Sequence, residues 1–179
     1  GYNNIGDFNT FLGSCAGYNN TIGSINTFIG QCVGRCNTTG DGNIFINTKS
    51  VNTTGNNNIY IGSQAGYNSL GTDNIYFGYR CGYGAVGSSG HNNTGFGSYT
   101  LSQIDTGSFN LALGRQAGSY LTTGNYNSFI GDGAGFTSTT CSYNTFIGSA
   151  AGERNNTDFN TFIGWAAGQS TGIGTGFTN

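Results

Sequence analysis

Apolar and polar residues follow a unit of about seventeen residues that recurs along the whole chain. In its most regular form, at residues 144–152, the unit reads Asn-Thr-Phe-Ile-Gly-Ser-Ala-Ala-Gly. We call this Asn the anchor and count it as position zero of the unit. The ten anchors are Asn9, Asn26, Asn43, Asn58, Asn74, Asn93, Asn110, Asn127, Asn144 and Asn160. Successive anchors are 17, 17, 15, 16, 19, 17, 17, 17 and 16 residues apart. A fixed short period predicts a stack of similar coils, because one such unit cannot bury a core alone.

Two adjacent positions of the unit are apolar. Position +3 is apolar in all ten units and comprises Leu12, Ile29, Ile46, Ile61, Phe77, Phe96, Leu113, Ile130, Ile147 and Ile163. Position +2 is aromatic in eight units, at Phe11, Phe28, Phe45, Tyr60, Tyr76, Phe129, Phe146 and Phe162. Neighbouring side chains of a strand point to opposite faces. We expect the +3 residues to form the core inside the coil and the +2 residues to form a seam against a second column.

The predicted fold is therefore all-β: a parallel β-solenoid (a β-roll) of about ten coils of roughly 17 residues, forming a single repetitive segment over residues 1–179. Glycines before and after each apolar pair supply the corners, and no stretch between them is long enough for a helix. The apolar +2 face suggests that columns associate, most simply as a three-fold bundle. Because the chain starts in mid-unit at Gly1 and stops where a new anchor is due, after Asn179, we expect more coils on both sides.

The anchor asparagines predict a structural ladder. In-register Asn side chains can hydrogen-bond to the identical residue in the coils above and below, as in stacked amide ladders. The alternative is a row of Asn side chains that contacts a ligand. We favour the ladder because the column lies beside the apolar positions.

Composition narrows the class of protein further. Charged residues make up only 7% of the chain and the net charge is −2, whereas aromatic residues reach 14%. Disordered chains usually combine high net charge with few aromatics, so this chain is expected to be ordered. Five scattered basic residues make no footprint for nucleic acid. No apolar run approaches the length of a membrane span.

The anchor motif, together with linking segments such as Asn37-Thr38-Thr39-Gly40, resembles the Asn-Thr-Ala-Ile-Gly-type repeats of bacterial and phage tail-fibre or adhesin proteins. Those repeats are similar to the head repeats of YadA-like trimeric autotransporter adhesins. The resemblance implies a left-handed β-roll, usually trimeric, exposed on a cell or virion surface. The YadA-type unit is shorter and carries small aliphatic residues where this chain has Phe or Tyr.

No pattern of catalytic or metal-binding residues recurs in the chain. The single histidine, His91, has no second ligand beside it in the sequence, and the seven acidic residues fall on different positions of the repeat. A metal site or an acid–base pair needs convergent groups. We therefore predict no catalytic residues, no metal, no cofactor and no enzymatic activity.

The cysteines raise one structural question. Cys15 and Cys32 both occupy position +6 of consecutive units, which is expected to bring their Cα atoms within disulfide range. A bridge would indicate an oxidising compartment. The alternative is that both are small fillers, like Ala150 and Ala166 at the same position.

Asn-x-Ser/Thr sequons raise the question of glycosylation. They occur at Asn19, Asn37, Asn52, Asn92 and Asn155, all in linking segments. An Asn- and Thr-rich sequence also forms such motifs by chance, so glycosylation depends on passage through a eukaryotic secretory route.

The sequence favours a non-enzymatic fibre segment, extracellular or on a cell or virion surface, that acts as an attachment shaft or head. Its partners would be copies of itself, as a trimer or filament, and a host-surface receptor or glycan. The alternative function is a self-assembling structural filament whose copies stack end to end. A minor alternative is ice binding by the +1 column of Thr10, Thr27, Thr145 and Thr161, which Ile44, Ile59, Ile75 and Leu111 interrupt.

Overall fold

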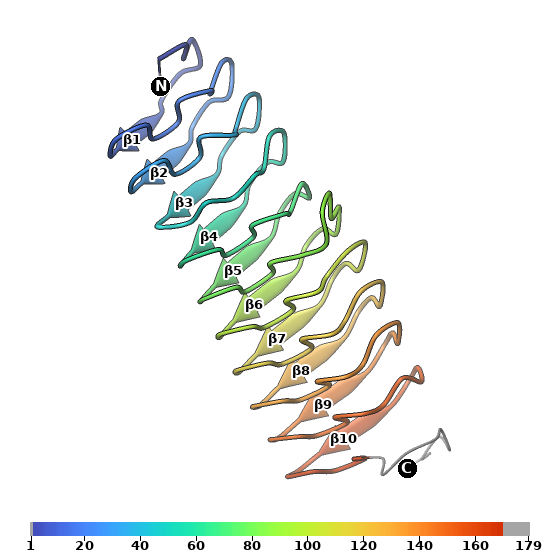
Figure 1. Cartoon of the computed structure of the whole chain (residues 1–179). Helices are drawn as coiled ribbons and strands as arrows, with labels where there is room; N and C mark the ends of the chain where they lie inside the picture. Colours follow the sequence, from blue (N-terminus) through green and yellow to red (C-terminus); the bar gives the residue numbers. More distant parts are fainter. Residues whose placement is uncertain (1, 170–179) are drawn as a thin grey trace.

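The computed structural model describes residues 2–169 and shows a parallel β-solenoid in which each repeat forms one coil (Figure 1). The predicted fold is confirmed: the ten strands form one sheet in chain order, and the described residues contain no helix. The chain ends, on which the expectation of further coils rests, lie outside the described residues. Each strand covers positions +1 to +3; the strands are β1 (Thr10–Leu12), β2 (Thr27–Ile29), β3 (Ile44–Ile46), β4 (Ile59–Ile61), β5 (Ile75–Phe77), β6 (Thr94–Phe96), β7 (Leu111–Leu113), β8 (Ser128–Ile130), β9 (Thr145–Ile147) and β10 (Thr161–Ile163).

The register places equivalent positions of the repeat side by side. Phe28 pairs with Phe45, and Phe45 with Tyr60, and the other strand pairs follow the same rule. Between consecutive strands, a return segment runs back beside the sheet and closes the coil (Figure 1). The molecule is therefore a column in which each side chain lies against its counterparts one coil away.

The interior of each coil holds the +2 side chain, so the predicted assignment of the two strand faces is wrong. The predicted seam residues from Phe28 to Phe162 are buried, and Phe11 in the first strand is partly buried. The predicted core residues face outward and are half-buried or exposed, such as Leu12, Phe77 and Ile163. All ten +3 residues share this outward placement: Leu12, Ile29, Ile46, Ile61, Phe77, Phe96, Leu113, Ile130, Ile147 and Ile163.

The return segment explains why the aromatic residue lies inside. It presents small residues to the strand, with Ala at +7 and Gly at +8 in most coils. A Cβ atom built on Gly34 or Gly152 would lie less than 3.0 Å from the ring of Phe28 or Phe146 in the same coil. In these coils, the ring therefore leaves no room for a side chain at position +8. The rings stack along the axis with centroids 4.9–5.4 Å apart from Phe11 to Tyr76.

Two coils lack the ring and fill the space in another way. Position +2 is Gly95 in the sixth coil and Ala112 in the seventh. The sixth coil has Leu101 where most coils have the +8 glycine, and Leu101 is fully buried. A Cβ atom built on Gly118 would meet Phe129 Cδ2 of the next coil at 2.8 Å and Leu101 Cδ2 at 3.0 Å, whereas its counterparts in most other coils meet the ring of their own coil. Leu101 and the Phe129 ring therefore share the space beside Gly118, and Leu101 takes part of the room that a ring at position 112 would need.

The predicted Asn ladder is present, and its hydrogen bonds reach the backbone as well as the neighbouring amide. In all nine coil-to-coil steps, the Oδ1 atom of one anchor accepts a hydrogen bond from the backbone N–H of the next, at 2.8–3.1 Å. From Asn9 to Asn127, the Nδ2 group donates to a carbonyl of the following coil, as from Asn110 to Gly124 at 2.9 Å. Asn144 and Asn160 donate instead to carbonyls of their own coil. In five of the nine steps, the Nδ2 group of one anchor also donates a hydrogen bond to the Oδ1 atom of the anchor before it. Each anchor from Asn9 to Asn127 thus satisfies one donor and one acceptor at the corner before the next strand.

Replacing one rung of this ladder should destabilise the column strongly. Asn110→Ala leaves the N–H of Asn127 and the C=O of Gly124 without their partners in a buried site. We expect a loss of about 2–5 kcal/mol in the free energy of unfolding, measured by chemical denaturation. Asn19→Ala is the matched control, since Asn19 is exposed and its side chain makes no hydrogen bond to the described residues. Equal stability of the two variants would contradict the structural role of the ladder.

Restoring the common ring in the seventh coil should also destabilise the protein. Ala112→Phe places a ring in space that Leu101 already fills, and overpacking typically costs about 1–3 kcal/mol. Adding Leu101→Gly should recover part of that loss, because the pair then matches the other coils. A double-mutant cycle by denaturation measures the coupling. Additive effects of the two substitutions would show that the two sites do not share this space.

Candidate functional site

The interior columns offer no surface to a ligand. The anchors from Asn26 to Asn160 are buried, with their amides hydrogen-bonded inside the column. Burial raises the pKa of the Tyr60 and Tyr76 hydroxyls well above their usual value, because the phenolate would lose its hydration. The Tyr60 hydroxyl stays protonated and donates a hydrogen bond to Ser69 Oγ at 2.9 Å. The interior therefore stabilises the fold, and any functional site lies on the outer surfaces.

Of the two alternatives for Cys15 and Cys32, the bridge is absent, since all five cysteines are free thiols. Cys15 and Cys32 have nearly the same backbone conformation, with φ of 57° and 56°. In an in-register parallel stack, equivalent side chains therefore point the same way and not toward each other. Cys15 is exposed and Cys32 is half-buried. Ala150 and Ala166 at the same position of the repeat are half-buried as well.

The sequons divide into two groups. Asn19 and Asn92 are exposed, whereas Asn37, Asn52 and Asn155 are buried. Asn37 donates from Nδ2 to Asn20 Oδ1 at 2.6 Å, in a second and shorter Asn column inside the coil. A glycan on any of the three buried residues would require the coil to open. Burial therefore disfavours modification of these three residues in the folded chain, and glycosylation of the sequons stays a prediction.

The outward side of the sheet carries half-buried or exposed apolar residues in every strand. We call it the outer face and define it by the +1 and +3 residues of the ten strands. Phe77 and Phe96 are 47% and 43% exposed, and their rings stack at 5.8 Å. Most +1 residues are half-buried, and four of them are the aliphatic Ile44, Ile59, Ile75 and Leu111. Apolar side chains thus follow the column on the face where sequence reasoning expected a core.

A second exposed feature was missed by the sequence reasoning. Phe109, Tyr126, Tyr143 and Phe159 occupy position −1 of the last four coils and form an aromatic ladder. Their ring centroids lie 4.9–5.1 Å apart, the rings are within 8° of parallel, and each ring is about half exposed or more. All four residues have positive φ, which is rare for bulky side chains. The signal in the sequence was the recurrence of Phe and Tyr directly before the anchor.

The return side of the column carries a cleft with a volume of about 630 Å³. Its walls come from the segments that follow β5, β6 and β7, and they include Arg80, Tyr83, Tyr99, Asp105 and Tyr120. No pattern in the sequence indicated this cleft, because its residues come together only through the stacking of three coils.

Features of other functional classes are not found in the described part of the chain. Within residues 2–169, no group of three or more His, Cys, Asp or Glu side chains converges as a metal site would require. His91 lies on the surface, where its Nδ1 accepts a hydrogen bond from the backbone N–H of Thr72 at 3.1 Å. Over the same range, no helix has the length and apolar character needed to cross a membrane.

Comparison with known proteins adds no relative: neither protein-family models nor curated proteins nor solved structures give a match to this chain. The resemblance to tail-fibre and adhesin repeats therefore stays a prediction from the repeat motif.

The thiols should separate into two classes of reactivity. Desolvation raises the pKa of Cys81 to about 12 and that of Cys141 to about 11, so both stay protonated at pH 8, and both are buried. We expect a thiol reagent such as DTNB to modify Cys15 rapidly at pH 8 and to modify Cys81 and Cys141 only after unfolding. Cys15→Ala, which introduces the residue found at 150 and 166, should remove the fast phase. Loss of all free thiols in native, non-reduced protein would contradict the structure.

Proposed function

We propose that this chain is a non-enzymatic segment of a fibre on a cell or virion surface, and that copies of it associate side by side through the outer face. The observation that carries the proposal is the outer face itself. Apolar patches of more than a few hundred square ångströms are rare on monomeric soluble proteins and usually mark interaction sites. Here, half-buried or exposed apolar residues occupy position +3 in all ten strands.

The contact proposed between columns differs from the one predicted from sequence. The +2 rings are buried inside each coil and are not available to a neighbour. The outward +3 residues take their place as the proposed seam. With five basic and seven acidic residues in the whole chain, charge repulsion between copies is weak. Association through an apolar face of this kind would be driven by the hydrophobic effect.

The shape of the molecule supports a role in spanning distance. Ten strands at the usual strand spacing of about 4.8 Å give a column roughly 48 Å long. Each additional coil lengthens such a column without enlarging its cross-section. Repeated coils also present the same side chains many times, which favours binding to many weak sites at once. A trimer is the assembly that the resemblance to adhesin repeats implies.

Charged substitutions on the outer face should abolish self-association. Phe77→Lys combined with Phe96→Glu replaces two exposed rings that are partners in the β5–β6 register by an opposite-charge pair. Such pairs are tolerated on a sheet surface, so the monomer should still fold. We expect sedimentation velocity to show oligomers for the unmodified protein and monomers for the variant.

The matched control is Thr123→Lys combined with Thr140→Glu, which places the same charges on an exposed corner of consecutive coils. The control should assemble like the unmodified protein. An unmodified protein that stays monomeric at concentrations of tens of micromolar would overturn the proposal.

A further inference from the structure

The cleft on the return side forms where the repeat is least regular. Its lining residues lie within 80–85, 99–105 and 116–122, which are the return segments of the fifth, sixth and seventh coils. The longest spacing between anchors, 19 residues, separates Asn74 from Asn93. The additional residues form a turn at 84–88 with positive φ at Gly84 and Gly87. This turn is tied to the next coil, since Gly84 N–H donates to Ser102 C=O and Ala85 N–H to Ile104 C=O, at 3.2 and 3.1 Å.

Three tyrosines give the cleft aromatic walls. Tyr83, Tyr99 and Tyr120 come from the three successive coils, and all three rings are at least partly exposed. The guanidinium of Arg80 lies 4.9 Å from the ring centroid of Tyr83 and 6.0 Å from that of Tyr99. Its Nε atom donates to Gln64 Oε1 at 2.8 Å. Arg80 is therefore held in place, and both of its Nη groups remain without a protein acceptor among residues 2–169.

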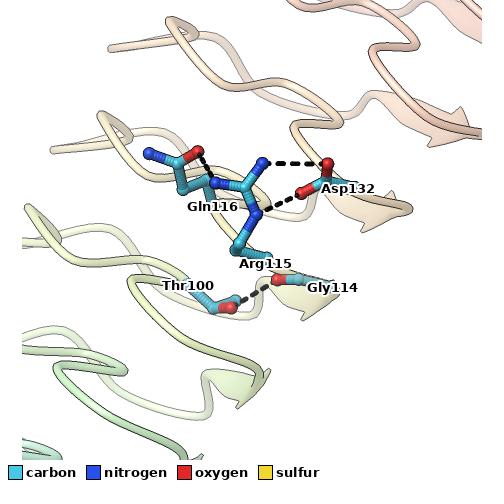
Figure 2. A network of polar contacts seen from close by, with 5 residues as sticks. All are labelled: Thr100, Gly114, Arg115, Gln116 and Asp132. Carbon is cyan, nitrogen blue, oxygen red and sulfur yellow. Dashed lines mark hydrogen bonds and ion pairs between the residues drawn. The ribbon is translucent and has the colours of Figure 1, made fainter.

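The remaining polar groups offer both donors and acceptors. Arg115 donates to Gln116 Oε1 at 2.9 Å and is itself held by the carboxylate of Asp132 (Figure 2). This contact fixes the Gln116 amide and leaves its Nε2 group free to donate. The carboxylate of Asp105 is half-buried and accepts no hydrogen bond from the part of the chain that the structure describes. Ser102 and Ser119 form a hydroxyl pair 2.9 Å apart.

These features identify the class of ligand. One Arg and one Asp leave the cleft with no net charge, which disfavours a polyanion such as nucleic acid. The polar side chains of the cleft can hydrogen-bond to hydroxyl groups, and the flat tyrosine rings can pack against C–H groups. A ligand with many hydroxyls and with faces made of C–H groups would use both. The volume of about 630 Å³ is that of a small-molecule site, and the three coils extend about 10 Å along the column.

We propose that this cleft binds a short oligosaccharide, whose sugar rings pack on Tyr99 and Tyr120 and whose hydroxyls bond to Asp105, Gln116 and Arg80. This inference deepens the proposed surface role and rests on it, because a fibre exposed on a surface would meet glycans. The cleft faces away from the strands, so a single column could bind a glycan while its outer face is covered by another copy.

The test is binding of the folded protein to an array of defined oligosaccharides, followed by calorimetric titration with the oligosaccharides that bind. Tyr99→Ala removes one ring and introduces the residue that positions 150 and 166 already hold at similar φ, of 56° and 53°. We expect it to weaken binding about tenfold, as the loss of one aromatic contact does. Asp105→Asn keeps the size of the side chain and should also weaken binding.

The matched control is Tyr143→Asn, which removes an exposed ring of the aromatic ladder and introduces the residue found at positions 57 and 92. Its affinity should be unchanged. A blank array with folded protein, or equal affinities for Tyr99→Ala and the unmodified protein, would overturn the cleft proposal. Sedimentation of the same samples separates the two proposals: oligomers with a blank array reject the cleft alone, and glycan binding by a monomer rejects the assembly alone.

Discussion

The hydrogen bonds of the anchor asparagines are the interaction on which the rest of the column depends. The residue before each anchor has positive φ, as Tyr126 and Tyr143 do, so the backbone turns sharply there. This turn leaves an N–H and a C=O at a buried corner, and an unpaired buried group costs about 1–3 kcal/mol. One Asn side chain pairs with both. Because each amide reaches from one coil to the next, it also fixes the register of the coils.

The other columns of side chains follow from that register. Aromatic residues stack inside the coils, apolar residues recur on the outer face, and the last four coils align exposed rings before their strands. The cleft lies where the repeat departs from its rule, in the coils that have the longest corner and no ring at Gly95 or Ala112. Local exceptions to a regular pattern are often sites of function, because they are places where the fold alone does not determine the sequence.

The sequence predicted much of this architecture and little of its surface. The repeat period predicted the positions of all ten strands and of the Asn ladder, because few folds other than a β-solenoid have glycine corners and an Asn residue at regular intervals. It did not decide which face of the strand lies inside, because Phe146 and Ile147 are both apolar and alternation alone makes no choice between them. That choice depends on the +8 glycine, which lies across the coil. The cleft requires Arg80, Tyr99 and Tyr120 to meet from three coils, and no local spacing reveals such a meeting.

The packing of Leu101 has a consequence for how such a gene can gain or lose repeats. Most coils contain their own ring, so duplicating or deleting one of them leaves every column continuous. The sixth and seventh coils differ, because Leu101 of one fills the space beside Ala112 of the other. Recombination between them would leave a hole on one side and a clash on the other. These two coils form a single heritable unit of about 34 residues, which supplies two of the three return segments that line the cleft.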